Sequence, residues 1–241
     1  MRVVHTRTVS DGSGPSGFVP DAVMIEWKPG PATDPWAQPA GGSAGGRDAR
    51  LPAMQTGDVL RPGAADASVR RATPADVPAI AAVQTRALRA AYADILDPEV
   101  LAELSAGALE PSWTSEVGRR QSPSARHTVL VACSGSTVVA VAAIRPSEEP
   151  DADGDDGDLA VLAVDPAHQR AGHGSRLLSA VVAHLRETGV TRLVAWSPAT
   201  DEARRGFLTS AGMVPDGARR TYETSDGRRV TEVRLSAALA E

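Results

Sequence analysis

The chain has 241 residues, of which 42% are hydrophobic, and a formal net charge of -5 at neutral pH. Its acidic balance, with arginine pairs scattered rather than gathered, argues against a nucleic-acid partner, and its longest apolar stretch, near residues 138–144, is far shorter than a membrane span. The single cysteine, Cys133, excludes an internal disulfide and fits a cytoplasmic protein.

The first 67 residues differ in composition from the rest of the chain. They hold 10 of the 22 glycines and 8 of the 18 prolines. A non-periodic segment this rich in glycine and proline is typical of disorder, and residues 40–47 have the composition of a flexible linker. We therefore predict a disordered extension over residues 1–67 and one folded domain over residues 68–241.

Two helices and a hairpin are expected at the start of the domain. Thr73 can serve as an N-cap with Pro74 at the first helical position, and apolar residues follow at helical spacing as far as residue 91. A shorter helix is expected over residues 98–104. The β-rich segments 128–132 and 137–144 are separated by a short serine and glycine turn, which predicts a hairpin.

The acidic stretch over residues 148–158 invites a calcium hypothesis. An EF-hand loop starting at Asp151 would need glycine at its sixth position and glutamate at its twelfth, where the chain has Asp156 and Leu162. His168 and His173 also lack partners at metal-ligand spacing. We predict no metal site, and a solvated loop over these acidic residues.

The second half of the domain alternates strands and helices. Gly189 and Gly212 are placed to end the two helices, and Asp226-Gly227 is a strong signal for a closing hairpin. The predicted elements are a strand over 159–164, a helix with a buried stripe from Leu177 to Leu185, a strand over 192–197, a helix over 201–210, and strands over 219–224 and 228–235.

The connection between the strand over 159–164 and its helix has the build of a phosphate site. Free backbone N–H groups at a helix N-terminus, with glycines that allow close approach, favour an anion. The spacing matches neither a mononucleotide loop nor an esterase elbow, and the third position of a dinucleotide turn is Leu177. The pattern that fits is Q-x-x-G-x-G, filled by Gln169, Gly172 and Gly174.

This pattern resembles motif A of the GNAT acetyltransferase superfamily, whose loop holds the pyrophosphate of acetyl-CoA. A second stretch, F-L-T-S-A-G-M-V-P-D-G at residues 207–217, is similar to the family's F-Y-x-x-x-G-F-x-P-D-G. The resemblance covers roughly residues 69–239. It implies an α/β fold of GNAT type, with a mixed central sheet of about six to seven strands flanked by helices.

The resemblance also implies where acetyl-CoA binds. The strands over 159–164 and 192–197 would splay apart, and the pantetheine arm would lie in the gap between them. The cofactor-binding positions that it implies are Leu162, Ala163, Val164, Gln169, Arg170, Ala171, Gly172, His173, Gly174, Ser175 and Asp201.

For catalysis, the resemblance points to Asp158, at the start of the motif strand, as the group that meets the acceptor amine. An ordinary aspartate, with a pKa of about 3.9, is a weak acceptor for an ammonium with a pKa of about 10.4. Either burial raises the pKa of Asp158, or Asp158 accepts the proton through a water molecule, or it only binds the ammonium group. The tyrosine that many relatives use as general acid is Leu208 here, which leaves Tyr92 and Ser197 as candidates.

The function implied is transfer of an acetyl or acyl group from acetyl-CoA to a primary amine of a small molecule or a protein N-terminus. The Leu208 substitution makes a non-catalytic acyl-CoA sensor the first alternative, and a protein-interaction domain without ligand the second. The expected partners are acyl-CoA and an amine, and the protein is expected to be a monomer or a homodimer.

Overall fold

The computed structural model of the protein describes residues 67–94, 96–119, 126–223 and 229–239. The predicted disordered extension, apart from its last residue, and the predicted Asp226-Gly227 turn lie outside the described residues. Among the residues that are described, no helix is both long enough and apolar enough to cross a membrane.

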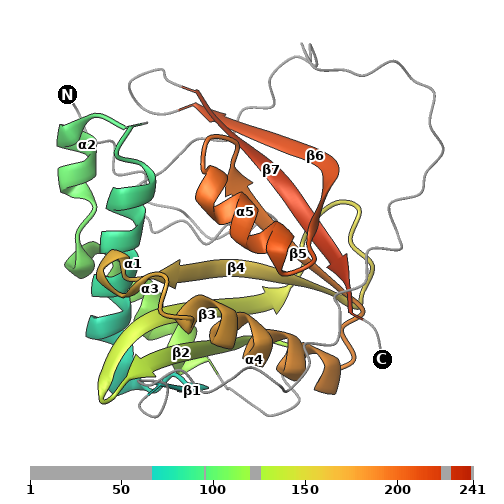
Figure 1. Cartoon of the computed structure of the whole chain (residues 1–241), viewed down its shortest axis with the longest axis horizontal. Helices are drawn as coiled ribbons and strands as arrows, with labels where there is room; N and C mark the ends of the chain where they lie inside the picture. Colours follow the sequence, from blue (N-terminus) through green and yellow to red (C-terminus); the bar gives the residue numbers. More distant parts are fainter. Residues whose placement is uncertain (1–66, 95, 120–125, 224–228, 240–241) are drawn as a thin grey trace, which may run out of the picture.

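A seven-stranded mixed sheet organises the domain, in the order β1-β2-β3-β4-β5-β7-β6 (Figure 1). Neighbouring strands are antiparallel except β4 and β5, which are parallel. This architecture confirms the predicted fold class. The strands are β1 (Ala67–Arg71), β2 (Thr128–Ser134), β3 (Thr137–Pro146), β4 (Asp156–Val164), β5 (Arg192–Pro198), β6 (Val214–Glu223) and β7 (Arg229–Ala238).

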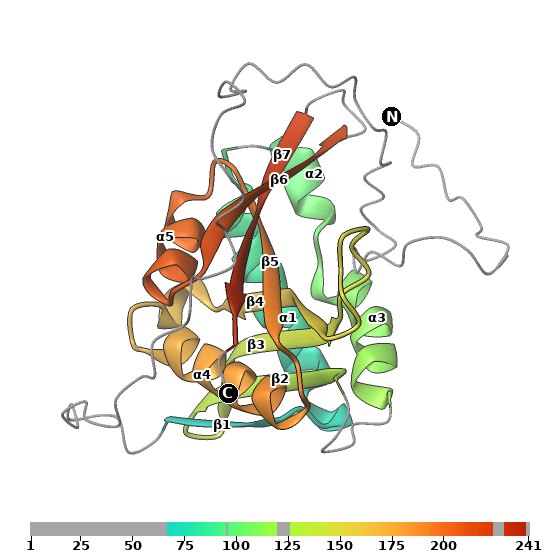
Figure 2. The ribbon, with the colours of Figure 1, turned by 90° about the vertical axis from the view of Figure 1, so that its right-hand side faces the viewer.

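Helices cover both faces of the sheet (Figure 2). One face packs against α1 (Val77–Ala91) and α3 (Ala106–Gly118), and the other against α4 (His173–Glu187) and α5 (Glu202–Ser210). Strands β2 and β3 are therefore buried on both faces, which explains why they are almost entirely apolar. The short helix α2 (Pro98–Glu103) follows α1 and buries none of its residues.

Helix α3 and strand β1 were not among the predicted elements. Ser105 caps α3 by accepting a hydrogen bond from the N–H of Ala108 at 3.3 Å, and Pro111 lies inside the helix. Proline disfavours helix interiors, so the sequence gives little sign of this element. Tertiary packing compensates: Trp113 is fully buried and donates from Nε1 to Oε1 of Gln84 on α1 at 2.7 Å.

The prediction of a solvated loop over the acidic residues 148–158 is wrong for its last three residues. Asp156 and Asp158 belong to β4 and are only 2% and 6% exposed. Arginines from the adjacent strands neutralise them: Arg192 lies 2.7 Å from Asp156, and Arg145 lies 2.9 Å from Asp158. These partners are distant in sequence, so the charge pattern of the loop alone did not indicate burial.

Candidate functional site

The two parallel strands part after their first three pairs, and this parting is the opening, or gap, between β4 and β5. β4 and β5 pair only from Asp156–Asp158 to Arg192–Val194, although β4 continues to Val164 and β5 to Pro198. On their outer sides β4 stays paired with β3, and β5 with β7. The two strands therefore splay apart, as the resemblance implied, and expose backbone groups of β4 toward the gap.

The backbone groups that face this gap belong to alternate residues of β4. The carbonyl of Leu162 accepts a hydrogen bond from α5 across the gap, whereas the N–H of Asp165 donates to the carbonyl of Val139 on β3. Successive residues of a strand direct their backbone N–H and C=O groups to opposite sides. The backbone groups of Leu162 and Val164 therefore point into the gap. Ala163, between them, directs its backbone groups toward β3.

Arg204 of α5 crosses the gap with its side chain. Its Nη1 donates to the carbonyl of Leu162 on β4 at 2.7 Å, and its Nε donates to the carbonyl of Trp196 on β5 at 3.3 Å. Burial lowers the pKa of Arg204, because removing the guanidinium from water disfavours its charge. Asp201 is the N-cap of α5, and its Oδ1 accepts a hydrogen bond from the N–H of Arg204 at 2.9 Å.

The loop after β4 leads to an uncapped helix end. A short 3-10 turn, Pro166–His168, comes first, and α4 then begins at His173 after its N-cap residue Gly172, whose φ of 80° lies in the left-handed region. Because glycine has no side chain, Gly172 cannot cap the first turn of α4 with a side-chain hydrogen bond. The N–H groups of residues 173–175 thus stay available at the positive end of the helix dipole, which is an anion-binding geometry.

Asp165 fixes the base of this loop. Its Oδ1 accepts from the N–H of Ala167 at 3.0 Å, and its Oδ2 accepts from Nη2 of Arg86 on α1 at 2.6 Å. Burial alone would raise the pKa of Asp165, but these hydrogen bonds outweigh it and lower the pKa. Gln169 turns back toward the strand, with Nε2 at 3.5 Å from the carbonyl of Val164.

The remaining loop residues differ in exposure. Arg170 is exposed and has a φ of 63°, whereas His173 is buried and its pKa is lowered by burial first and then by Arg176 and His168. A Cβ on Gly174 would lie 3.4 Å from both Phe207 and Val164, so a glycine here also lets α4 approach β4 and α5 closely.

Asp158 lies on the face of the sheet that α1 and α3 cover. Leu159 belongs to the core on the α4 side, so its neighbour Asp158 points to the opposite face. Its Oδ2 accepts from Nε of Arg145 at 2.9 Å, yet burial dominates and raises the pKa of Asp158. A raised pKa makes this carboxylate a better proton acceptor than an ordinary aspartate.

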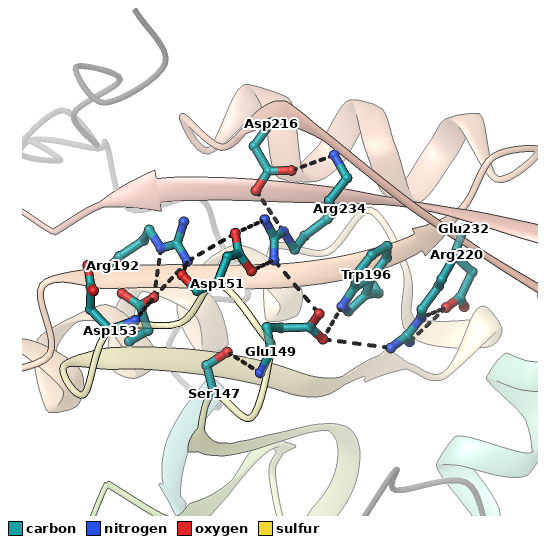
Figure 3. Close-up of polar contacts among 12 residues, drawn as sticks. Ser147, Glu149, Asp151, Asp153, Arg192, Trp196, Asp216, Arg220, Glu232 and Arg234 are labelled. Atoms are coloured by element: carbon teal, nitrogen blue, oxygen red, sulfur yellow. Dashed lines mark hydrogen bonds and ion pairs between the residues drawn. The ribbon is translucent and has the colours of Figure 1, made fainter. Parts of the chain in front are cut away.

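Beside Asp158, on the same face, charged side chains surround Trp196. Its Nε1 donates to Glu149 at 2.9 Å, and the guanidinium of Arg220 stacks over its ring at 4.2 Å from the centroid. Figure 3 shows this cluster, which ties the loop before β4 to β5, β6 and β7 through Arg234. Among the described residues, no group of His, Cys, Asp and Glu is arranged to hold a metal ion.

The candidates for a general acid differ in their surroundings. Ser197 is fully buried, and its hydroxyl donates to the carbonyl of Pro198 at 3.4 Å. Leu208 is likewise fully buried in the core. Tyr92, at the end of α1, is partly buried, and burial first and the charge of Glu232 next raise its pKa to about 12.

Comparison with known proteins agrees with this geometry. A family model described as the GNAT acetyltransferase family matches residues 98–213, which include the opening between β4 and β5 and the start of α4. This match identifies a GNAT acetyltransferase domain in the chain.

Solved structures share the fold of this GNAT domain at low sequence identity. The PaiA N-acetyltransferase from Thermoplasma acidophilum, solved in complex with coenzyme A, has a TM-score of 0.58 and 14% identity, over 71% of this chain and 98% of that one. A ribosomal-protein-alanine N-acetyltransferase from Brucella melitensis has a TM-score of 0.56 and 24% identity, over 71% of this chain and 99% of that one.

Sequence identity to another relative is higher over one segment of the chain. An amino-acid acetyltransferase from Neisseria meningitidis is 42% identical over 80 residues, which make up 32% of this chain. That segment covers only 18% of the relative's length.

The structure places most of the predicted positions around the gap between β4 and β5. The loop residues 169–175 and Asp201 lie where the gap between β4 and β5 ends, and Asp158 lies where the two strands part. Arg204 was missed by the sequence reasoning. Its spacing of four residues before Leu208 places it on the same side of α5, which is the signal that could have found it.

Proposed function

We propose that the protein is an N-acetyltransferase that transfers the acetyl group of acetyl-CoA to a primary amine of a small molecule or a protein N-terminus. The observation that carries the proposal is the opening between β4 and β5, which leads directly to the uncapped first turn of α4. A ligand whose extended, amide-containing arm leads to a pyrophosphate fits such a path, because the arm can pair along a strand and the pyrophosphate can lie at a helix N-terminus.

In this proposal the donor is held mainly by backbone groups. The pantetheine arm pairs with the gap-facing groups of Leu162 and Val164, and the pyrophosphate lies on the N–H groups of residues 169–175. Asp201 stays the N-cap of α5 beside the arm.

The acceptor approaches from the face that carries Asp158. The amine nitrogen attacks the thioester carbonyl, the C–N bond forms, the C–S bond breaks, and the amine proton passes to Asp158 directly or through water. Burial of Asp158 supports this role, since it narrows the pKa gap between the carboxyl and the amine. The similarity to an amino-acid acetyltransferase supports free amino acids as the first acceptors to test.

The second candidate is an acyl-CoA sensor without turnover. The specific observation in its favour is Leu208, which is fully buried and has no proton to donate. Both candidates bind acetyl-CoA, but only the enzyme releases free CoA thiol when an amine is added.

The first experiment is thermal unfolding of the full chain with and without acetyl-CoA. Ligand at about 100 times its dissociation constant should add about 2.7 kcal/mol, or roughly 5–10 °C. No shift at millimolar acetyl-CoA would reject both the enzyme and the sensor.

The second experiment measures thiol release with a panel of amino acids and short peptides. Asp158→Asn should lower kcat about 100-fold or more while acetyl-CoA still binds. Asp153→Asn is the matched control, because Asp153 belongs to the same acidic stretch but precedes the strand. Binding without turnover across the panel would favour the sensor, and unchanged kcat in Asp158→Asn would remove Asp158 from the mechanism.

A further inference from the structure

Arg204 is a partly buried cation that has no ion-pair partner among the described residues. Its two hydrogen bonds go to backbone carbonyls, of Leu162 and Trp196. Within the described parts of the chain, no carboxylate lies within ion-pair distance of it, although Asp201, Glu232 and Asp158 act on it from further away. By contrast, Arg145, Arg192, Arg220 and Arg234 each contact a carboxylate directly.

A guanidinium in such a place is poised for an anion. Carbonyl oxygens satisfy some of its N–H groups but do not neutralise its charge, and burial makes the unpaired charge costly. An anion formed in the gap between β4 and β5 would therefore be stabilised more strongly there than in water. If the proposed function holds, one anion does form in that gap, namely the thiolate of CoA.

We propose that Arg204 contacts the sulfur of CoA and stabilises it as a thiolate. This inference rests on the proposed function. When the arm of the donor pairs with the carbonyl of Leu162, the guanidinium gives up that contact and turns to the sulfur. As the C–S bond breaks, its electron pair stays on the sulfur, and the proton of the amine goes to Asp158 or water, so Arg204 transfers no proton.

The same idea explains how the site works with leucine at position 208. A hydroxyl would protonate the leaving thiolate, whereas a fixed positive charge lowers the pKa of the thiol so that no proton is needed. Thiols beside a cation have pKa values as low as about 3.5–7.5, compared with about 8.5 in water. Arg204 lies one helical turn before Leu208 on the same side of α5, so it reaches the region that a side chain at 208 would otherwise serve.

The test is the number of protons released when free CoA binds, measured by titration calorimetry at pH 7 in buffers of different ionisation enthalpy. Wild type should release on the order of half a proton or more, because a thiol that is mostly protonated in water becomes a thiolate in the site. Desulfo-CoA, which lacks the thiol, is the matched ligand and should bind without that release.

Substitutions then assign the effect to one side chain. Arg204→Met keeps the length of the side chain without its charge and should abolish the proton release, whereas Arg204→Lys should keep part of it. Arg205→Met removes the same charge from the next residue of α5, whose Nε has no hydrogen-bond partner within the described parts of the chain, and should release protons like wild type. Where turnover is measurable, kcat should fall at least tenfold in Arg204→Met and recover in part with added guanidinium ion.

Other results would overturn the inference. Equal proton release by wild type and Arg204→Met, or none by wild type, means that the sulfur is not beside this charge. Tighter binding of CoA to Arg204→Met with unchanged kcat means that the side chain only fills the empty gap. Failure of wild type to bind either ligand would instead reject the proposed function, and with it this role. The wild-type comparison of CoA with desulfo-CoA decides even if Arg204→Met does not fold.

Discussion

The carboxylate of Asp165 lies 2.6 Å from Nη2 of Arg86, and this pair joins α1 to the loop between β4 and α4. The two residues are 79 positions apart in the chain. Helix α1 covers the face on which the acceptor is proposed to bind, whereas the loop is the proposed phosphate site. A single ion pair therefore couples the position of the two halves of the site.

Removing that pair should loosen the loop. Asp165→Ala loses both the Arg86 contact and the hydrogen bond from Ala167, so we expect a stability loss of about 1–3 kcal/mol and a several-fold weaker affinity for CoA. Arg86→Gln, which leaves the Ala167 bond in place, should show a smaller loss. Titration calorimetry with CoA and thermal unfolding measure the two effects. Equal CoA affinity in all three proteins would show that the loop holds its shape without this clamp.

Gly172 should matter for both folding and ligand binding. Its φ of 80° disfavours any residue with a Cβ, so Gly172→Ala should cost about 1–2 kcal/mol and should also weaken CoA binding by shifting the first turn of α4. Gly189, at the other end of the same helix, has a φ of 72°, and a Cβ added there would meet open space. Gly189→Ala should cost the same stability and leave CoA affinity unchanged. Loss of affinity in both variants would attribute it to general destabilisation.

The buried bond between Trp113 and Gln84 predicts a non-additive pair of substitutions. Trp113→Phe leaves Oε1 of Gln84 buried without a donor and opens a small cavity, so a loss of about 2–4 kcal/mol is expected. Adding Gln84→Leu should recover part of that loss, because both partners of the bond are then apolar. Urea unfolding of wild type, both single variants and the double variant measures the coupling. Strict additivity would mean that the bond contributes little.

The family, the fold class and the position of most elements followed from local patterns in the sequence. The prediction of a helix end at Gly189 is confirmed by its left-handed φ, and the predicted helix over 201–210 is confirmed by α5. Such features depend on a few neighbouring residues, which a sequence displays directly. The roles given to Asp158 and to the loop residues remain predictions.

What escaped prediction depends on contacts between distant residues. Helix α3 is held by Trp113 against α1 in spite of an internal proline, and Asp156 is buried because Arg192 lies across from it on the next strand. Arg204 lies between β4 and β5 only because the two strands part and α5 packs over them. No local pattern reports such meetings, since they arise from the topology of the sheet.

Asp76 should contribute stability that depends on pH. Hydrogen bonds from Arg70 chiefly, and from Thr73, lower the pKa of Asp76 in the folded protein, despite the opposing effect of burial. A lowered pKa stabilises the fold above the unfolded value of about 3.9, and that contribution is lost as the pH falls through the folded pKa. Asp76→Asn should therefore lose about 1–2 kcal/mol at pH 7, and its difference from wild type should shrink below about pH 4. The exposed Asp94 gives the control, because Asp94→Asn should leave the free energy of unfolding at pH 7 unchanged.

We expect substitution of Arg234 to lower the free energy of unfolding more than substitution of other arginines of the domain. Its side chain is 6% exposed and bonds both oxygens of Asp151, at 2.6 and 2.5 Å, and Oδ2 of Asp216 at 2.7 Å. Arg234→Met leaves the largely buried Asp216 without this guanidinium, and breaking a buried pair in this way costs about 3–5 kcal/mol. Asp151→Asn should cost about 1 kcal/mol or less, because the Asp151 side chain is 52% exposed and water can replace its partner.

Urea unfolding of the two variants separates burial from charge as the cause of that difference. Equal losses would mean that the pair acts as one unit regardless of exposure. A much larger loss for Arg234→Met would show that the stability comes from the desolvated guanidinium, which holds the loop before β4 against β6 and β7. Glu149 of that loop also accepts a hydrogen bond from Nε1 of Trp196 at 2.9 Å. Arg234→Met should therefore change the fluorescence of Trp196 before global unfolding begins.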